Sequence, residues 1–160
     1  MPGKVVKLAE LKKLRASWKR RKKMVVFTNG CFDLIHRGHV QYLEQARKLG
    51  DLLIVGLNTD ASVRKIKGTK RPILLQKERA EILCAFWFVD YVVLFHEDTP
   101  LKLIRAIKPD VLIKGADWSL GKIVGADIVL KNRGKVKRIK FSKGCSTSGI
   151  IEKIIKNYCK

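Results

Sequence analysis

Short apolar runs alternate with amphipathic segments along most of this chain, and this alternation restricts its fold more than any other feature. Residues 24–29 form an apolar run that Gly30 ends, which is too short for a buried helix and predicts a buried strand. Residues 39–49 predict a helix with one apolar face, and Gly50 and Asp51 end it before the next apolar run at 52–57. The pattern therefore begins with a strand, helix, strand unit.

The same alternation continues toward the C-terminus. Further strands are expected at 90–95, 111–114 and 136–141, and helices at 76–87, after Pro100, at 124–132 and from about residue 147. Strands separated by helices of this length imply right-handed crossovers. The sequence thus predicts an α/β fold, a single doubly wound Rossmann-like domain whose mainly parallel five-stranded sheet is covered on both faces. Ligands of such sheets bind at the carboxyl ends of the strands.

Two segments lie outside this alternation. Residues 1–23 carry apolar residues at roughly helical spacing before the basic cluster at 19–23, which predicts an amphipathic basic helix packed on the main domain, residues 24–160. The second segment, from Lys65 to Leu75, is basic and irregular. Loops of this kind can close over a ligand.

Charge and cysteine content restrict the class of protein. The chain has 35 Lys and Arg against 14 Asp and Glu, a formal net charge of +21. Such a charge attracts polyanions, but it does not distinguish nucleic acid, anionic lipid and small phosphorylated substrates. A solvated basic face is the fourth interpretation. No run approaches the roughly 18 apolar residues of a membrane span, and no apolar segment follows the basic start, so we expect a soluble cytoplasmic protein without a membrane partner. The scattered cysteines favour reduced thiols: Cys31, Cys84, Cys145 and Cys159.

The segment between the first strand and the first helix carries the strongest functional signal, Thr28-Asn29-Gly30-Cys31-Phe32-Asp33-Leu34-Ile35-His36-Arg37-Gly38-His39. Two histidines three residues apart at a helix start can face the same way, and the glycines let backbone approach an anion that the helix N-terminus favours. The segment is neither a Walker loop nor a GxGxxG fingerprint. Zinc ligation by Cys31, His36 and His39 lacks a fourth ligand, and ordinary helix-start histidines are the remaining alternative.

Three further groups could bind anions. The hydroxyls of Ser146, Thr147 and Ser148 precede a helix with an apolar face, where they could serve as N-caps or as a phosphate cradle. Lys67, Arg71 and Arg79 lie in and after the irregular loop, and a guanidinium fork suits phosphate oxygens. Residues 114–118 end the fourth expected strand. Asp98-Thr99-Pro100 follows the third, as a binding segment or as a helix cap.

In this order the motifs resemble the HxGH nucleotidyltransferase superfamily, and within it the D-glycero-β-D-manno-heptose 1-phosphate adenylyltransferases. The resemblance covers about residues 5–158 and rests on GCFDLIHRGHVQYLEQARKLGD, LNTDASVRKIKG, RPI, Glu78-Arg79, VDYVVLFHEDTP, KPDVLIKGADW and GCSTSGIIEKI. The family more often has a second glycine where this chain has Ala116.

The resemblance implies specific roles for residues of this chain. It implies catalytic roles for His36, His39, Lys67 and Arg79. It implies nucleotide binding by Asn29, Gly30, Cys31, Phe32, Gly38, Lys114, Gly115, Asp117, Trp118, Ser146, Thr147 and Ser148. It implies substrate binding by Asp33, Arg71, Asp98 and Thr99, and no metal site built from protein ligands.

The implied reaction joins AMP from ATP to the heptose 1-phosphate, giving ADP-heptose for lipopolysaccharide core synthesis and pyrophosphate, with Mg²⁺ bridging phosphate oxygens. The partners would be small molecules, without specific nucleic acid, and a homodimer stays open. In many relatives a sugar kinase is fused in front, so a separate kinase is expected here. The alternatives are a glycerol-3-phosphate cytidylyltransferase and a non-catalytic nucleic-acid-binding module, although no RRM, KH or zinc-finger signature is present.

Overall fold

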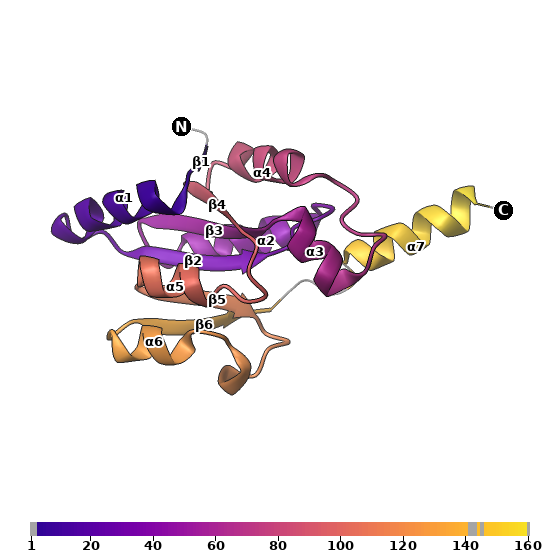
Figure 1. Cartoon of the computed structure of the whole chain (residues 1–160). Coiled ribbons are helices and arrows are strands. Elements are labelled where there is room, and N and C mark those ends of the chain that lie inside the picture. Colours follow the sequence, from indigo (N-terminus) through magenta and orange to yellow (C-terminus); the bar gives the residue numbers. More distant parts are fainter. Residues whose placement is uncertain (1–2, 141–143, 145, 160) are drawn as a thin grey trace.

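A six-stranded parallel sheet forms the middle layer of the protein (Figure 1). The computed structural model describes residues 3–140, 144 and 146–159. The strands run in the order β1-β4-β3-β2-β5-β6. Their bounds are β1 Lys4–Val5, β2 Val25–Gly30, β3 Leu52–Asn58, β4 Tyr91–Phe95, β5 Val111–Gly115 and β6 Lys135–Ile139.

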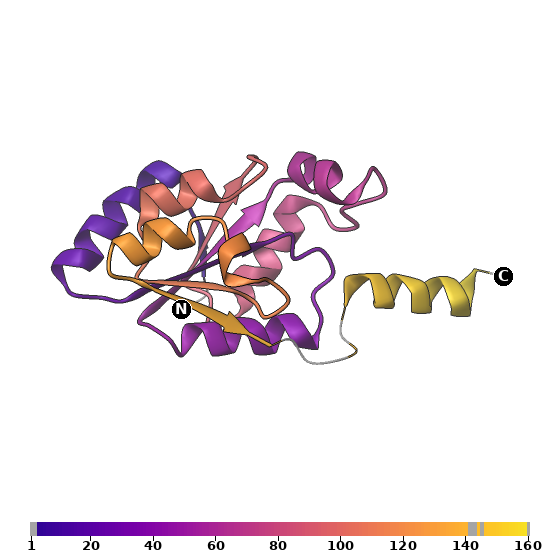
Figure 2. The same ribbon diagram turned by 90° about the horizontal axis from the view of Figure 1, so that it is seen from below.

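Helices cover both faces of this sheet (Figure 2). One face packs against α1 Leu8–Arg20, α5 Leu101–Ile107 and α6 Ala126–Lys131, and the other against α2 Arg37–Arg47 and α4 Gln76–Ala85. The remaining helices are α3 Asp60–Lys67, the 3-10 turn η1 Leu120–Lys122 and α7 Thr147–Tyr158. The predicted doubly wound α/β fold with a parallel sheet is therefore confirmed.

The central strand β2 shows why the apolar runs are continuous. Val25 and Phe27 point into the layer of α1, α5 and α6, whereas Val26 belongs to the opposite core beneath α2 and α4. Thr28 also points toward α2, where its hydroxyl lies 2.7 Å from that of Tyr42. Both faces of the strand are buried, so nearly every residue in it must be apolar or hydrogen-bonded.

The sheet has one strand more than predicted, because β1 adds a short parallel edge to β4. Helix α3 was also missed, since residues 65–67 were assigned to an irregular loop. Thr59 begins this helix by accepting a hydrogen bond from the Ser62 amide, and Gly68 ends it with φ 94°. Residue 141 of the last expected strand, and Cys145, lie outside the described residues.

An ion pair between Arg15 and Asp110 adds to the apolar packing that ties α1 to the rest of the fold. The Arg15 guanidinium donates to the carbonyls of Ile107 and Lys108 at the end of α5, each at 3.0 Å, and to Asp110. The second Asp110 oxygen accepts the amide of Val25 at 2.8 Å. This pair therefore joins a helix end, the start of the central strand and the N-terminal helix.

Two peripheral features leave surface uncovered. Helix α7 stands away from the sheet in both views (Figures 1 and 2), and none of its described residues is buried. The Thr147 hydroxyl bonds to the carbonyl of Leu34 at 3.3 Å. At the opposite edge of the sheet from β1, strand β6 exposes Lys135, Lys137 and Arg138.

Two further findings concern the described residues. Cys31, Cys84 and Cys159 are free thiols there. Within the same part of the chain, no helix combines the length and apolar character needed to cross a membrane.

We predict that Arg15→Ala lowers the free energy of unfolding by about 2 kcal/mol, because three acceptors lose a charged donor. Urea denaturation followed by circular dichroism measures this. Arg20→Ala, on the exposed side of the same helix, is the matched control and should change stability by less than about 0.5 kcal/mol. Equal effects of both substitutions would contradict the role of the ion pair.

Candidate active site

A pocket of about 620 Å³ opens at the carboxyl ends of the strands, where sheets of this type bind ligands. Its walls come from the segments that follow β2, β4 and β5, from the ends of β3 and α3, and from the start of α7. Segments far apart in sequence meet here because the parallel strands all end at the same edge.

Most of the predicted site residues line this pocket. They are Asn29, Gly30, Cys31, Phe32, Asp33, His36, His39, Lys67, Arg71, Asp98, Thr99, Lys114, Asp117, Trp118, Ser146, Thr147 and Ser148. Arg79, Gly38 and Gly115 do not line it. Pro100 of the predicted Asp98-Thr99-Pro100 segment also lines it, together with four residues that sequence reasoning missed: Asn58, Ile66, Phe95 and Val124. Asn58 could have been found, since it is a polar residue at the carboxyl end of an apolar strand.

The two histidines of the first segment stack on each other. Their ring centroids are 3.8 Å apart at 21°, and the ring of Phe32 lies 5.2 Å from that of His39. The Nδ1 atoms of both histidines are buried without a hydrogen-bond partner among the described residues, as is Oδ1 of Asn29. Orphaned polar atoms in a pocket indicate that a polar ligand completes the hydrogen bonding.

Burial sets the protonation of this pair. The pKa of His39 is lowered to about 4, mainly by burial and to a lesser extent by the neighbouring His36. A hydrogen bond with the Leu34 backbone acts in the opposite direction. Burial also lowers the pKa of His36. Burial therefore favours the neutral form of both rings in the free protein, and a bound polyanion would raise both pKa values because it favours the charged form.

The chain reaches this arrangement through an unusual backbone turn. Phe32 adopts the left-handed region at φ 44°, which is uncommon for an aromatic residue and occurs mainly where function requires it. A Cβ on Gly30 would lie 3.1 Å from the Phe32 ring, so glycine lets that ring fold back over the strand end. The turn thus directs the segment from β2 to the histidines.

Asp33 holds the loop that carries Arg71. Its side chain is 1% exposed and accepts the Arg71 guanidinium and the amides of Ile73 and Leu74, at 2.8 and 3.0 Å for the amides. Substrate binding was predicted for Asp33, but its oxygens already have three donors. The carboxylate therefore positions the Arg71 side chain, which stays in the pocket lining.

The structure places Arg79 outside the pocket, in disagreement with its predicted phosphate contact. The residue is fully buried and donates to the carbonyls of Leu74 and Cys31 and to Asp60. A buried guanidinium is expensive unless its donors are satisfied, and here they hold the 71–75 loop, the first segment and α3 together. In this structure Arg79 therefore supports the loops around the pocket and does not face a ligand.

The turn before α7 meets the histidine segment from another side. Ser146 is the N-cap of the helix, where its side chain accepts the Gly149 amide at 3.0 Å, so the capping interpretation is confirmed for this serine. The hydroxyl of Thr147 bonds to Leu34 at 3.3 Å. The phosphate cradle stays a prediction, supported by the position of the turn in the pocket lining.

Lys114 brings a partly buried positive charge to the end of β5. Its ammonium lies 3.4 Å from the Asn29 carbonyl and 5.5 Å from the centre of the Trp118 ring. Burial lowers the pKa of Lys114 to about 8, although the carboxylate of Asp117 opposes the shift. An anionic ligand would stabilise the charged form of this lysine and raise its pKa again.

Two ion pairs connect the segment after β4 to the neighbouring helices. Asp98 pairs with Lys65 of α3 at 2.6 Å, and Glu97 pairs with Lys102 of α5 at 2.9 Å. Pro100 occupies the N-cap position of α5 without a side-chain cap, so the alternative of Asp98 or Thr99 as helix caps is wrong.

Cys31 differs from a metal-binding or nucleophilic cysteine. Burial raises the pKa of its thiol, and this outweighs the lowering effect of Lys67, Arg79 and Arg71. The raised pKa disfavours the thiolate that either role needs. Within the described residues no group of three or more His, Cys, Asp and Glu side chains is arranged to hold a metal ion.

Comparison with known proteins shows what this chain is similar to. The model of the cytidylyltransferase-like family matches residues 27–153. The bifunctional protein HldE of Citrifermentans bemidjiense is 59% identical over 138 residues, which are 86% of this chain and 28% of that protein. The HldE protein of Geobacter sulfurreducens is 54% identical over 98% of this chain and 32% of its own length. The chain thus spans about a third or less of these relatives.

Two solved structures are also similar to this chain. The lipopolysaccharide core biosynthesis protein from Thermoplasma volcanium is 31% identical with a TM-score of 0.61, over 77% of this chain and 99% of that one. A pantoate-β-alanine ligase from Francisella tularensis shares the fold at 12% identity, with a TM-score of 0.63, over 96% of this chain and 79% of that one. The family model covers well over half of the residues, and the chain therefore belongs to the cytidylyltransferase-like family.

Proposed function

We propose that the protein transfers AMP from ATP to D-glycero-β-D-manno-heptose 1-phosphate, giving ADP-heptose and pyrophosphate. The observation that carries the transfer chemistry is the stacked pair of histidines facing a pocket with the α7 turn and the side chain of Lys114. Support for the heptose substrate comes from the quoted motifs and from the identity to HldE proteins over most of the chain.

In this reaction the phosphate oxygen of the sugar attacks the α-phosphorus of ATP. A P–O bond forms there as the bond to the bridging α,β oxygen breaks, and the electron pair leaves with pyrophosphate. His36 and His39 donate N–H groups to phosphate oxygens and stabilise the charge that moves onto the leaving group. Such a transfer needs no protein nucleophile, in keeping with the raised pKa of the Cys31 thiol.

The remaining groups bind the ends of the nucleotide. The hydroxyls of Ser146 to Ser148, with the amides at the start of α7, suit the β- and γ-phosphates. Lys67 and the Asp33-held Arg71 add charge from the α3 side of the pocket. Arg79 has an indirect, positioning role, because it holds the loop that carries Arg71.

The substrate enters as the complex of ATP with Mg²⁺. Magnesium keeps several waters and binds mainly through phosphate oxygens with one or two carboxylates. Asp117 lines the pocket and forms no ion pair with another described residue, so the residues present fit such a complex.

A second candidate is transfer of CMP from CTP to glycerol 3-phosphate. The description of the matched family as cytidylyltransferase-like favours it. The two reactions use the same phosphate chemistry and differ in base and acceptor, so kinetic comparison separates them.

We predict that His36→Ala and His39→Ala each lower kcat by about 10²- to 10³-fold, the usual loss for one preorganised donor. Pyrophosphate release measures this, with circular dichroism to verify folding. His96→Ala is the matched control because that ring is exposed outside the pocket lining. Near wild-type turnover in either pocket variant would contradict the role of the pair.

We predict that affinity for ATP falls as the pH rises from 7 to 9. Lys114 loses its proton as the pH passes about 8, whereas both histidines are already neutral throughout this range. Lys114→Met should weaken binding about tenfold or more at pH 7 and remove the step near pH 8. Calorimetric titration at both pH values measures this, with the exposed Lys122→Met as control. An unchanged step in Lys114→Met would assign it to another group.

We predict that kcat/KM is much larger for ATP with the heptose 1-phosphate than for CTP with glycerol 3-phosphate. A site that hydrogen-bonds several sugar hydroxyls leaves buried groups unpaired when a smaller acceptor binds, which costs roughly 10⁴-fold or more in the strongest cases. Pyrophosphate release from both substrate pairs measures the ratio. A preference for the cytidine pair would replace the heptose assignment and leave the nucleotidyltransferase activity in place.

A further inference from the structure

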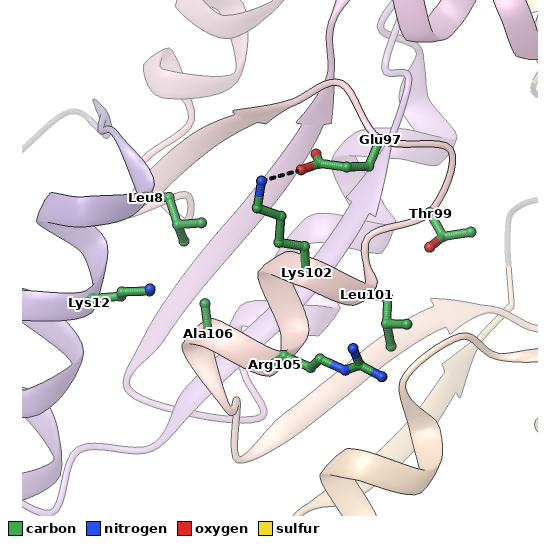
Figure 3. A pocket seen from close by; sticks show the side chains of 8 residues that line it. All are labelled: Leu8, Lys12, Glu97, Thr99, Leu101, Lys102, Arg105 and Ala106. Carbon is green, nitrogen blue, oxygen red and sulfur yellow. Dashed lines mark ion pairs between the residues drawn. The ribbon is translucent and has the colours of Figure 1, made fainter.

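A second hollow of about 500 Å³ lies between α1 and α5, outside the active pocket (Figure 3). Leu8 and Lys12 line it from α1, Lys102 and Arg105 from α5, and Glu97 and Thr99 from the segment after β4. Its volume falls within the range of small-molecule sites. Thr99 also lines the active pocket, so the two hollows share a wall.

Positive charge dominates this hollow. Three cationic side chains line it against the single carboxylate of Glu97. Lys102 already pairs with Glu97 at 2.9 Å, and this pair holds the pKa of Glu97 below its ordinary value. Lys12 and Arg105 form no hydrogen bond or ion pair with any described residue. Figure 3 shows Lys12 extending from α1 toward α5, and Lys102 extending toward Glu97.

The walls of the hollow are firmly held. Helices α1 and α5 share the core beneath them, where Leu11, Leu103, Ile104 and Ile107 are buried. Arg15 of α1 also donates to the carbonyls of Ile107 and Lys108 at the end of α5. The three cationic side chains are exposed and point in different directions in Figure 3, but they project from this fixed backbone and can turn toward an anion in the hollow.

We propose that this hollow is a binding site for a small phosphate-bearing molecule, recognised by Lys12, Arg105 and Lys102. A guanidinium and two ammonium groups match the charge of a phosphate or pyrophosphate group, and Leu8 offers an apolar wall for an organic part. Because Lys102 is engaged by Glu97, the anion competes with that carboxylate. The inference is independent of which substrates the active pocket takes.

Amide NMR titration of the full chain with inorganic pyrophosphate tests the proposal at about 0.15 M salt, which screens diffuse attraction between exposed charges. The amides of Lys12 and Arg105 report on the hollow, and those of His39 and Gly149 report on the active pocket. We expect a separate saturable binding curve at the hollow, with its own dissociation constant.

Three variants separate a built site from general basic attraction. Lys12→Ala with Arg105→Ala should weaken binding at the hollow about tenfold or more and leave the active-pocket curve unchanged. Lys13→Ala with Lys131→Ala removes the same charge from exposed positions outside the hollow and should change neither curve. Glu97→Gln should strengthen binding by up to about fivefold, since it frees Lys102.

The outcomes are distinct. A saturable curve lost only in the double variant of the hollow, and strengthened by Glu97→Gln, supports the site. Shifts that do not saturate, an equal loss in both double variants, or no strengthening by Glu97→Gln would overturn it. Circular dichroism of each variant excludes misfolding as the cause, and wild-type binding supplies the reference.

Discussion

The parallel pairing of β2 with β3 and β5 is the constraint on which the remaining structure depends. A strand with parallel neighbours on both sides cannot be reached by a tight turn, so each connection must cross a face of the sheet as a helix. Those helices bury both faces, and the segments at the carboxyl edge are left to form the pocket. The chemistry of this protein is gathered at one edge because the backbone hydrogen bonds allow no other arrangement.

Within that edge, residues that hold the site differ from residues that face the ligand. Asp33 and Arg79 use their charges on neighbouring backbone and side chains, and their near-complete burial makes those partners necessary. His36, His39 and Lys114 line the pocket, and burial lowers the pKa of each of them. The first group fixes geometry so that the second can stay unsatisfied until an anion arrives.

The sequence allowed the fold to be predicted wherever burial dictates composition. Strands such as Leu52–Asn58 are apolar on both faces and stand out, whereas β1 has two exposed residues and leaves no pattern to detect. Helix α3 escaped because its exposed lysines read as a basic loop, although Thr59 and Asp60 at its start carried a capping signal. Most pocket residues were found from motifs and strand ends. The scaffold role of Arg79 could not be predicted in this way, because a motif gives a residue's position in the sequence and not the direction in which its side chain points.

The exposed row of Lys135, Lys137 and Arg138 on β6 has a consequence for the protein in a crowded cell. An edge strand offers unpaired amides and carbonyls to any passing strand and is a common start of aggregation. Here two copies that approach edge to edge would bring these like charges into register before any hydrogen bond forms. The sheet can therefore end in open solvent and remain six strands wide.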